Sequence, residues 1–211
     1  MEIGDPVAAE PAAGRGWVLR RFLLPAPLVS AAAWLKWRAQ VSPRAEVELS
    51  PNLRLGPRTT VSSFVKIKSS QGRLVTGRDC GFASGCFLAP GPGGIELGND
   101  VVCGPNVVIV AMNYRYGTLG VPFSQQGVSS LGVRIGSNVW IGANSTILDG
   151  AVIGDNSIVV ANSLVNRRFP PNVIIQGNPA KVILKRDAPL EAMDGRGPGT
   201  AAGAGDTQRR S

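Results

Sequence analysis

A six-residue period over residues 135–168 constrains the fold of this chain more than any other feature. The segment reads IGSNVWIGANSTILDGAVIGDNSIVVANSLVNRR. An aliphatic residue opens each repeat, at Ile135, Ile141, Ile147, Ile153, Val159 and Val165. A period of six fits neither a 3.6-residue helix nor a plain alternating strand. It fits short strands that are joined by tight corners and stacked as a solenoid.

Two further positions of the repeat are restricted in composition. The third residue after the aliphatic one is a type that tolerates a left-handed backbone, namely Asn138, Asn144, Gly150, Asn156 and Asn162. The fourth is small or β-branched, namely Val139, Ser145, Ala151, Ser157 and Ser163. Three six-residue sides make an 18-residue triangular coil. We therefore expect Ile135 to stack on Ile153 and Ile141 on Val159.

The same phase continues upstream in longer coils. The inward positions recur 21 residues apart, at Leu55, Val61 and Ile67, then Thr76, Phe82 and Leu88, then Leu97, Cys103 and Ile109. The extra residues of these coils are expected at corners, over 70–72 and 91–93. Val41 and Val47 are expected to open a first coil.

An insertion interrupts the repeat between Leu97 and Ile135, which are 38 residues apart. The excess falls in residues 113–132, NYRYGTLGVPFSQQGVSSLG, which keep no six-residue phase. A long excursion from a rigid scaffold is typical of a functional loop, and this one contains Tyr114, Arg115 and Tyr116. The alternative is a mobile decoration.

The flanking segments predict caps and flexible ends. Residues 17–40 are apolar and basic, and 28–39 has helical spacing that predicts a cap over the first coil. The repeat domain is expected over 41–186. Pro170 and Pro171 are expected to stop the stack, followed by one more strand and a Gly-Asn-Pro turn. Residues 1–16 and 187–211 are rich in Ala, Gly and Pro and are expected to be disordered.

Composition excludes several kinds of chemistry. The chain has no histidine, which removes His-ligated zinc, Ser-His nucleophiles and imidazole bases, and no metal site is expected. The three cysteines fall at inward positions and are expected to be free thiols. The net charge of +8 suits an anionic ligand or surface. The basic residues form no stripe with aromatics, so nucleic-acid binding is not expected.

The N-terminal segment allows two interpretations. No apolar run is long enough for a membrane span. Basic residues and the tryptophans of 17–40 favour either a plain capping helix or peripheral contact with an anionic membrane face. We expect a cytoplasmic protein, with the inner face of the membrane as its second location.

The chain resembles the hexapeptide-repeat acyltransferases, in particular the sugar O-acetyltransferase branch of polysaccharide biosynthesis. The similar residues run from Leu53 to Lys185, and the most specific motifs are the repeat above, PFSQQG in the excursion and GNPAKVI near the end. The resemblance implies an all-β left-handed parallel β-helix and a homotrimer with active sites in the clefts between subunits. It also implies acetyl-CoA as co-substrate and a sugar or glycan precursor as acceptor.

The resemblance also implies a set of donor-binding residues. Gly142 ends the WIG motif and Ala143 follows it. Both residues, like Ala161, are expected to meet the pantetheine arm through backbone groups. Trp140 is expected to lie beside that arm. The residues implied for the nucleotide end of acetyl-CoA are Asn166, Arg167, Lys181 and Lys185.

The chain departs from this branch at the catalytic base. The branch begins its excursion with a histidine, and this chain has Met112, Asn113 and Tyr114 there. Asn113 and Tyr114 are therefore the catalytic candidates. Three interpretations remain: slow or Tyr114-assisted acetylation of a sugar hydroxyl, acetylation of an amino sugar that needs no base, and a scaffold or binding protein of a glycan-assembly complex without turnover.

Overall fold

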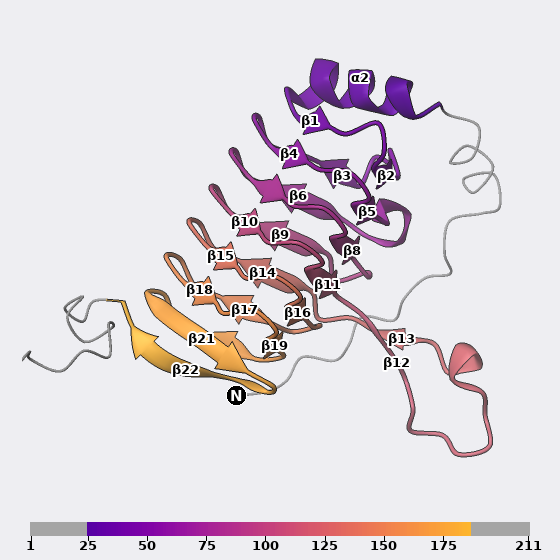
Figure 1. Cartoon of the computed structure of the whole chain (residues 1–211). Coiled ribbons are helices and arrows are strands. Elements are labelled where there is room, and N and C mark those ends of the chain that lie inside the picture. The colour runs from indigo at the N-terminus through magenta and orange to yellow at the C-terminus, as the bar shows by residue number, and fades with distance from the viewer. Residues whose placement is uncertain (1–24, 187–211) are drawn as a thin grey trace, which may run out of the picture.

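The computed structural model describes residues 25–186. The ends expected to be disordered, 1–16 and 187–211, and residues 17–24 lie outside the described residues. Short strands wind into a three-sided prism whose sides are three sheets, here named A, B and C (Figure 1). The chain passes from A to B to C in every coil, and the turns between them are named the A–B, B–C and C–A corners.

The sheets contain the following strands in spatial order. Sheet A consists of β1 (Gln40–Val41), β4 (Thr60–Val61), β7 (Gly81–Phe82), β10 (Val102–Cys103), β15 (Trp140–Ile141), β18 (Ile158–Val159), β21 (Val173–Gly177) and β22 (Ala180–Lys185). Sheet B consists of β2 (Glu46–Val47), β5 (Lys66–Ile67), β8 (Phe87–Ala89), β11 (Val108–Val110), β16 (Thr146–Ile147) and β19 (Leu164–Val165). Sheet C consists of β3 (Leu53–Arg54), β6 (Leu74–Thr76), β9 (Ile95–Leu97), β14 (Val133–Ile135), β17 (Val152–Ile153) and β20 (Arg168–Phe169).

The register between coils confirms the predicted stacking. Ile135 pairs with Ile153 and Ile141 with Val159, both in parallel strands. Upstream, Phe82 pairs with Cys103 across the 21-residue offset. Across the insertion, Cys103 pairs with Ile141. The fold is the predicted left-handed parallel β-helix.

The aliphatic positions fill the axis of the prism, and their burial supplies the main hydrophobic stabilisation. Ile109, Ile141 and Ile147 are fully buried. The small positions behind them, such as Ser145 and Ala151, are also buried, which lets successive coils approach closely.

The corners have the backbone geometry that their residue types predicted. The asparagines at the corners of the repeat have positive φ values of 54–61°, at Asn138, Asn144, Asn156 and Asn162. Gly150 has φ 81° at the equivalent position. Short polar or absent side chains hold this conformation at low cost. The corner chemistry of the sequence therefore sets the triangular cross-section.

The first coil is covered by helix α2 (Ala26–Trp37), as predicted (Figure 1). Ala33 is buried against the core, and Val29 and Trp37 pack partly against it. Three large apolar side chains of α2 remain exposed: Leu28, Trp34 and Leu35. In the described part of the chain, no helix has the length and apolarity needed to span a bilayer.

The far end corrects one prediction. Pro170 and Pro171 do not stop the stack, because β21 continues sheet A in parallel with β18. The prolines occupy the C–A corner, outside the strands, where no ladder N–H is required of them. The antiparallel strand β22 then pairs with β21 along the free edge of sheet A and closes it.

Candidate active site

The excursion leaves the prism at the B–C corner as a hairpin. Its root is the antiparallel pair β12 (Asn113–Tyr114) and β13 (Val128–Ser129), and its tip includes the 3-10 turn η2 (Phe123–Gln125). The loop projects well beyond the coils (Figure 1). The sequence correctly predicted where the insertion lies, but it did not predict the antiparallel pair at its root.

Asp149 fastens the end of the excursion to the next coil. Its Oδ1 atom accepts hydrogen bonds from the backbone N–H groups of Leu131 and Gly132, each at 2.8 Å. Its Oδ2 atom lies 3.4 Å from the Asn113 side-chain amide, which donates to it. Sequence reasoning missed this residue. The available signal was its spacing, because Asp149 follows Leu131 by one 18-residue coil.

A second anchor, Ser130, ties the same segment to the coil before the excursion. Its hydroxyl donates to the Ala111 carbonyl oxygen and accepts a 2.8 Å hydrogen bond from the Gly93 backbone N–H. The root of the excursion is therefore held from both sides. Groups at the root have defined positions relative to the prism.

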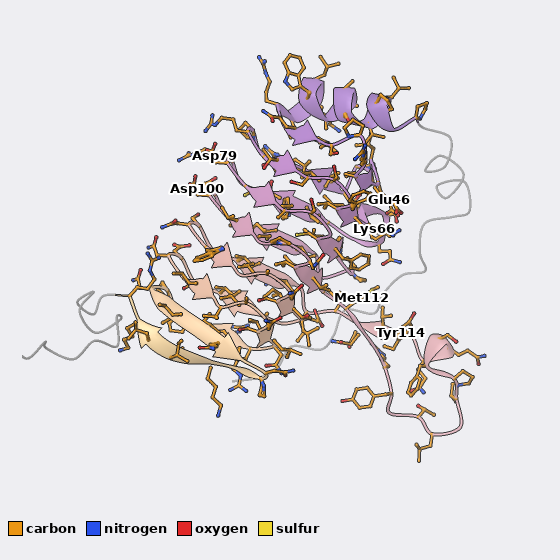
Figure 2. All side chains as sticks on the ribbon, in the orientation of Figure 1. Glu46, Lys66, Asp79, Asp100, Met112 and Tyr114 are labelled. Carbon is orange, nitrogen blue, oxygen red and sulfur yellow. The ribbon has the colours of Figure 1, made fainter. Side chains whose placement is uncertain are left out.

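The two catalytic candidates lie at this root. Asn113 and Tyr114 are neighbours on β12, and the Tyr114 side chain is 59% exposed. Figure 2 shows Met112 where the chain leaves the prism and Tyr114 on the projecting hairpin. Asp149 is the acidic group that contacts Asn113 here. The structure thus provides a phenol, an amide and a carboxylate at the B–C corner.

The donor-binding candidates Gly142, Ala143 and Ala161 stack at a different corner, A–B. A Cβ atom on Gly142 would lie 2.4 Å from the backbone nitrogen of Ala161, so glycine is required by the close approach of two coils. Ala143 lies one coil before Ala161, and the Ala143 carbonyl accepts a hydrogen bond from the Asn162 N–H at 2.9 Å. The predicted backbone contacts are therefore gathered along one edge.

The backbone N–H groups of Ala143 and Ala161 have no hydrogen-bond acceptor within residues 25–186. At the C–A corner the equivalent N–H groups of Ser137 and Asn99 are capped by side chains of the next coil. The Ser137 N–H donates to Asp155 Oδ1 at 2.6 Å, and the Asn99 N–H donates to Ser137 Oγ at 3.1 Å. Alanine has no oxygen with which to cap. Ala143 and Ala161 therefore present free donors on adjacent coils of the A–B corner, about 4.8 Å apart as stacked strands are.

Trp140 lies on the outer surface of sheet A, beside this corner. Its side chain is 56% exposed, between Val102 on β10 and Ile158 on β18. Val102 is also half exposed. Trp140 and Val102 give this surface an apolar strip next to the free N–H groups.

The four residues expected at the nucleotide end of the donor are not brought together. Lys181 pairs with Gln176 near the turn at Gly177, whose N–H donates to Ser163 Oγ at 3.2 Å, close to the A–B corner. Lys185 pairs with Val173 at the opposite end of β22. Asn166 and Arg167 lie at the B–C corner between β19 and β20.

The catalytic candidates and the three candidates for the pantetheine arm, Gly142, Ala143 and Ala161, lie on opposite edges of sheet B. From Ala143 to Asp149 the chain crosses that sheet in six residues, which corresponds to roughly 15–20 Å. One copy of the chain therefore does not bring Tyr114 to the free N–H groups. This geometry is relevant to the oligomeric state proposed below.

The cysteines are free and buried, as predicted, and are not suited to nucleophilic chemistry. Burial raises the pKa of Cys80 and of Cys86, and it raises the pKa of Cys103 well above its ordinary value. A thiol that stays protonated is a poor nucleophile. Within residues 25–186 no cluster of Cys, Asp and Glu could hold a metal ion.

Comparison with known proteins agrees with this architecture. Residues 132–167 match the family described as bacterial transferase hexapeptide (six repeats). A putative lipopolysaccharide biosynthesis O-acetyl transferase, WbbJ of Escherichia coli, is 34% identical over 125 residues, which cover 59% of this chain and 56% of that protein. The galactoside O-acetyltransferase of E. coli is 36% identical over 90 residues, 42% of this chain and 43% of that protein. The matches thus span about half the length of these relatives.

A solved structure shares the fold at low sequence identity. A point mutant of AntD, an N-acyltransferase from Bacillus cereus in complex with dTDP and coenzyme A, superposes with a TM-score of 0.64 at 20% identity. The match covers 78% of this chain and 92% of that one. The chain therefore contains a bacterial transferase hexapeptide repeat over residues 132–167, is similar over part of its length to bacterial sugar O-acetyltransferases, and has a left-handed β-helix fold.

Proposed function

We propose that the chain is an acetyl-CoA-dependent O-acetyltransferase that acts on a hydroxyl group of a sugar or glycan precursor. The similarity to a lipopolysaccharide O-acetyl transferase and to a galactoside O-acetyltransferase supports this substrate class. The excursion, which is anchored at the B–C corner by Asp149 and Ser130, is the element expected to bind the acceptor.

The observation that carries the proposal is the pair of free N–H groups at Ala143 and Ala161. The pantetheine arm of coenzyme A is an extended chain with two amide groups, whose carbonyls are hydrogen-bond acceptors. Two stacked donors on a rigid corner suit such a chain, because the backbone is fixed before the ligand arrives. The apolar strip with Trp140 lies beside it and suits the methylene groups of the arm.

The chemistry proposed is direct transfer. The acceptor hydroxyl oxygen attacks the thioester carbonyl carbon, the C–S bond breaks, and the hydroxyl proton passes to the leaving thiolate through an intervening group. Tyr114 is the proposed hydrogen-bonding group at this step, and Asn113, which donates to Asp149, is the second candidate beside it. Lack of a strong base lowers the rate by about 10²–10⁴-fold. Positioning of the acceptor next to the thioester supplies part of the rate enhancement that does not depend on a base.

The proposal requires a homotrimer. In a single chain, Tyr114 and the donor corner lie across sheet B from one another, so a neighbouring subunit must supply one of the two. The exposed Trp140 and Val102 give sheet A an apolar surface suited to such a neighbour. Closed cyclic symmetry is the usual way to repeat such a contact.

Two alternatives rest on the absence of histidine. Met112 occupies the position of the branch's base and cannot move a proton. An amino-sugar acceptor removes the need for that base, because an amine with a pKa near 8 is partly neutral at pH 7. A scaffold or binding role in a glycan-assembly complex removes the need for turnover altogether.

For the cellular location we propose the cytoplasm, where acetyl-CoA is available, with peripheral contact to the inner membrane face. The exposed Leu28, Trp34 and Leu35 of α2, with the basic Lys36 in its last turn, are the groups that support such contact.

The test is release of free coenzyme A from acetyl-CoA in the presence of matched acceptors, one sugar and the corresponding amino sugar, between pH 6 and 9. The O-acetyltransferase proposal expects turnover with the hydroxyl acceptor. Turnover restricted to the amino sugar, rising with pH as the amine deprotonates, supports N-acetylation. Binding of acetyl-CoA without turnover on either acceptor supports the scaffold.

A further inference from the structure

A groove of about 590 Å³ lies on the prism far from the excursion, where the end of α2 meets the first coils at the C–A corner. It is lined by the last residues of α2 and by the corners that follow β3, β6 and β9. Neither the donor corner nor the root of the excursion contributes to it. It is therefore separate from the candidate active site.

The lining of this groove is strongly basic. Lys36, Arg38, Arg54 and Arg78 all border it, and no carboxylate among residues 25–186 does. Lys36, Arg38 and Arg54 also have no ion-pair partner in that part of the chain. Like charges gathered without counter-charges raise the local potential and favour an anionic ligand.

Several arginines elsewhere on sheet C and at the C–A corner have carboxylate partners. Arg73 and Arg134 both pair with Glu96, at 3.5 and 3.7 Å. Arg58 donates two hydrogen bonds to Asp79, each at 2.5 Å. These arginines therefore differ from Lys36, Arg38 and Arg54 of the groove, which have no carboxylate partner within residues 25–186.

Two carboxylates, Asp79 and Asp100, directly follow the lining residues Arg78 and Asn99 but do not themselves line the groove. Asp79 is paired with an arginine outside the lining. The hydrogen bonds from Arg58 lower the pKa of Asp79, so the carboxylate stays ionised and committed to that arginine. Arg78 Nε lies 3.4 Å from Asp79 Oδ2 and is partly shared with it. Figure 2 shows Asp79 on the outer edge of the C–A corner.

Backbone of successive corners forms part of the lining of the groove, at Gly56 and Gly77. A Cβ atom on Gly56 would lie 2.0 Å from the carbonyl oxygen of Gly77, so the two corners stack in direct contact. Thr76 and Asn99 add polar groups to the wall, and the half-buried Trp37 adds an aromatic surface. Arginine forks bind phosphate oxygens in pairs, and the stacked corners fix the backbone around them.

We propose that this groove is a binding site for a diphosphate group. Arg54 and Arg78, on successive coils, contact the phosphate oxygens, while Lys36 and Arg38 close the site from the end of α2. Trp37 adjoins the organic part of the ligand. The chemistry is shared by a soluble nucleoside diphosphate and by the headgroup of a prenyl diphosphate lipid.

The experiment is calorimetric titration of the full chain with inorganic pyrophosphate. Arg54→Gln should weaken binding by about tenfold or more, because it removes a charge-assisted contact. Arg134→Gln is the matched control, since it removes the same charge from an arginine of sheet C that pairs with Glu96. It should leave the affinity within about twofold of wild type. Ala161→Ser, at the proposed donor corner, should also leave pyrophosphate affinity unchanged.

Two further titrations identify the source of the ligand. Tighter binding of uridine diphosphate than of pyrophosphate supports a soluble nucleotide. Binding to phosphatidylcholine vesicles only when they contain farnesyl diphosphate supports a lipid, provided that Arg54→Gln reduces it. Failure of all these probes to bind, or equal losses in Arg54→Gln and Arg134→Gln, overturns the proposal. So does a loss of pyrophosphate affinity in Ala161→Ser alone, which would assign the binding to the donor corner.

Discussion

The carboxylate of Asp149 lies one coil beyond Leu131 and accepts a 2.8 Å hydrogen bond from its backbone N–H. The neighbouring Gly132 N–H donates to the same oxygen. This pair of bonds fixes the point at which the excursion returns to the prism. The catalytic candidate Asn113 contacts the other carboxylate oxygen.

Asp149→Ala should therefore loosen the root of the excursion without unfolding the prism. Hydrogen bonds to a charged acceptor are worth about 1.5–3 kcal/mol, so amide hydrogen exchange at Leu131 and Gly132 should accelerate by more than tenfold. Asp149→Asn keeps one acceptor oxygen and should have a smaller effect. Unchanged protection in Asp149→Ala would show that Ser130 and the hairpin are sufficient anchors.

Tyr114→Phe tests the proposed hydrogen-bonding group at the reacting centre. Acceptor-hydroxyl turnover should fall by roughly tenfold or more in kcat, about 1.4 kcal/mol, with KM for acetyl-CoA little changed. Tyr116→Phe, on the same excursion with a 79% exposed side chain, is the control and should resemble wild type. Equal rates in both variants would remove Tyr114 from the mechanism.

Met112→His restores an imidazole where the resembling branch has one. If the acceptor is a hydroxyl group, turnover should rise, because a base with a pKa near 6.5 becomes available. The gain should appear above that pH, where the imidazole is neutral. An amino-sugar acceptor predicts no gain, and the comparison of the two acceptors in a single assay separates these outcomes.

The repeat could be predicted from sequence because its determinants are local. Ile135 stacks on Ile153 since the aliphatic residue, the left-handed corner and the small residue recur in every six positions. The placement of the excursion followed from the same phase. Its hairpin root did not, because residues 113–132 have no periodicity to read.

The candidate site was harder to predict, because it depends on which corner each residue occupies. The sequence correctly predicted that Ala143 and Ala161 lie at the same corner, because they are one 18-residue coil apart. Lys181 and Lys185 were expected together, yet an extended strand places them at opposite ends. The sequence predicted that Ala143 and Ala161 bind through their backbone, but not that their N–H groups are free. The structure shows this when the A–B corner is compared with the C–A corner, where Ser137 and Asp155 accept hydrogen bonds from such N–H groups.

The buried thiols give the stability a pH dependence. Because burial raises the pKa of Cys103 in the folded state, the unfolded chain loses its thiol proton first as the pH rises. The contribution of this thiol to the free energy of unfolding should be constant below about pH 8. Above that pH it should decrease, by up to about 1.4 kcal/mol per pH unit. Urea denaturation between pH 7 and 10 under reducing conditions measures it. Cys103→Ala should show a shallower decrease than wild type, and parallel curves would exclude this contribution.

The proposed trimer predicts a particle of about 66 kDa, from three chains of 22.0 kDa. Sedimentation equilibrium at micromolar concentration measures it directly. Trp140→Arg places a charge on the apolar strip of sheet A and should shift the equilibrium toward smaller species. A wild-type monomer at these concentrations would leave Tyr114 and the donor corner apart and would contradict the proposed site.

The central claim is that acetyl-CoA binds along the A–B corner through the free N–H groups of Ala143 and Ala161. The most direct measurement is a calorimetric titration of wild type and Ala161→Ser with acetyl-CoA. A serine there can cap the Ala143 N–H as Ser137 caps that of Asn99, and should weaken binding by about three- to tenfold. Ser137→Ala, which removes a cap at the C–A corner, should bind like wild type. Absence of acetyl-CoA binding, or equal affinities in wild type and Ala161→Ser, would contradict the account.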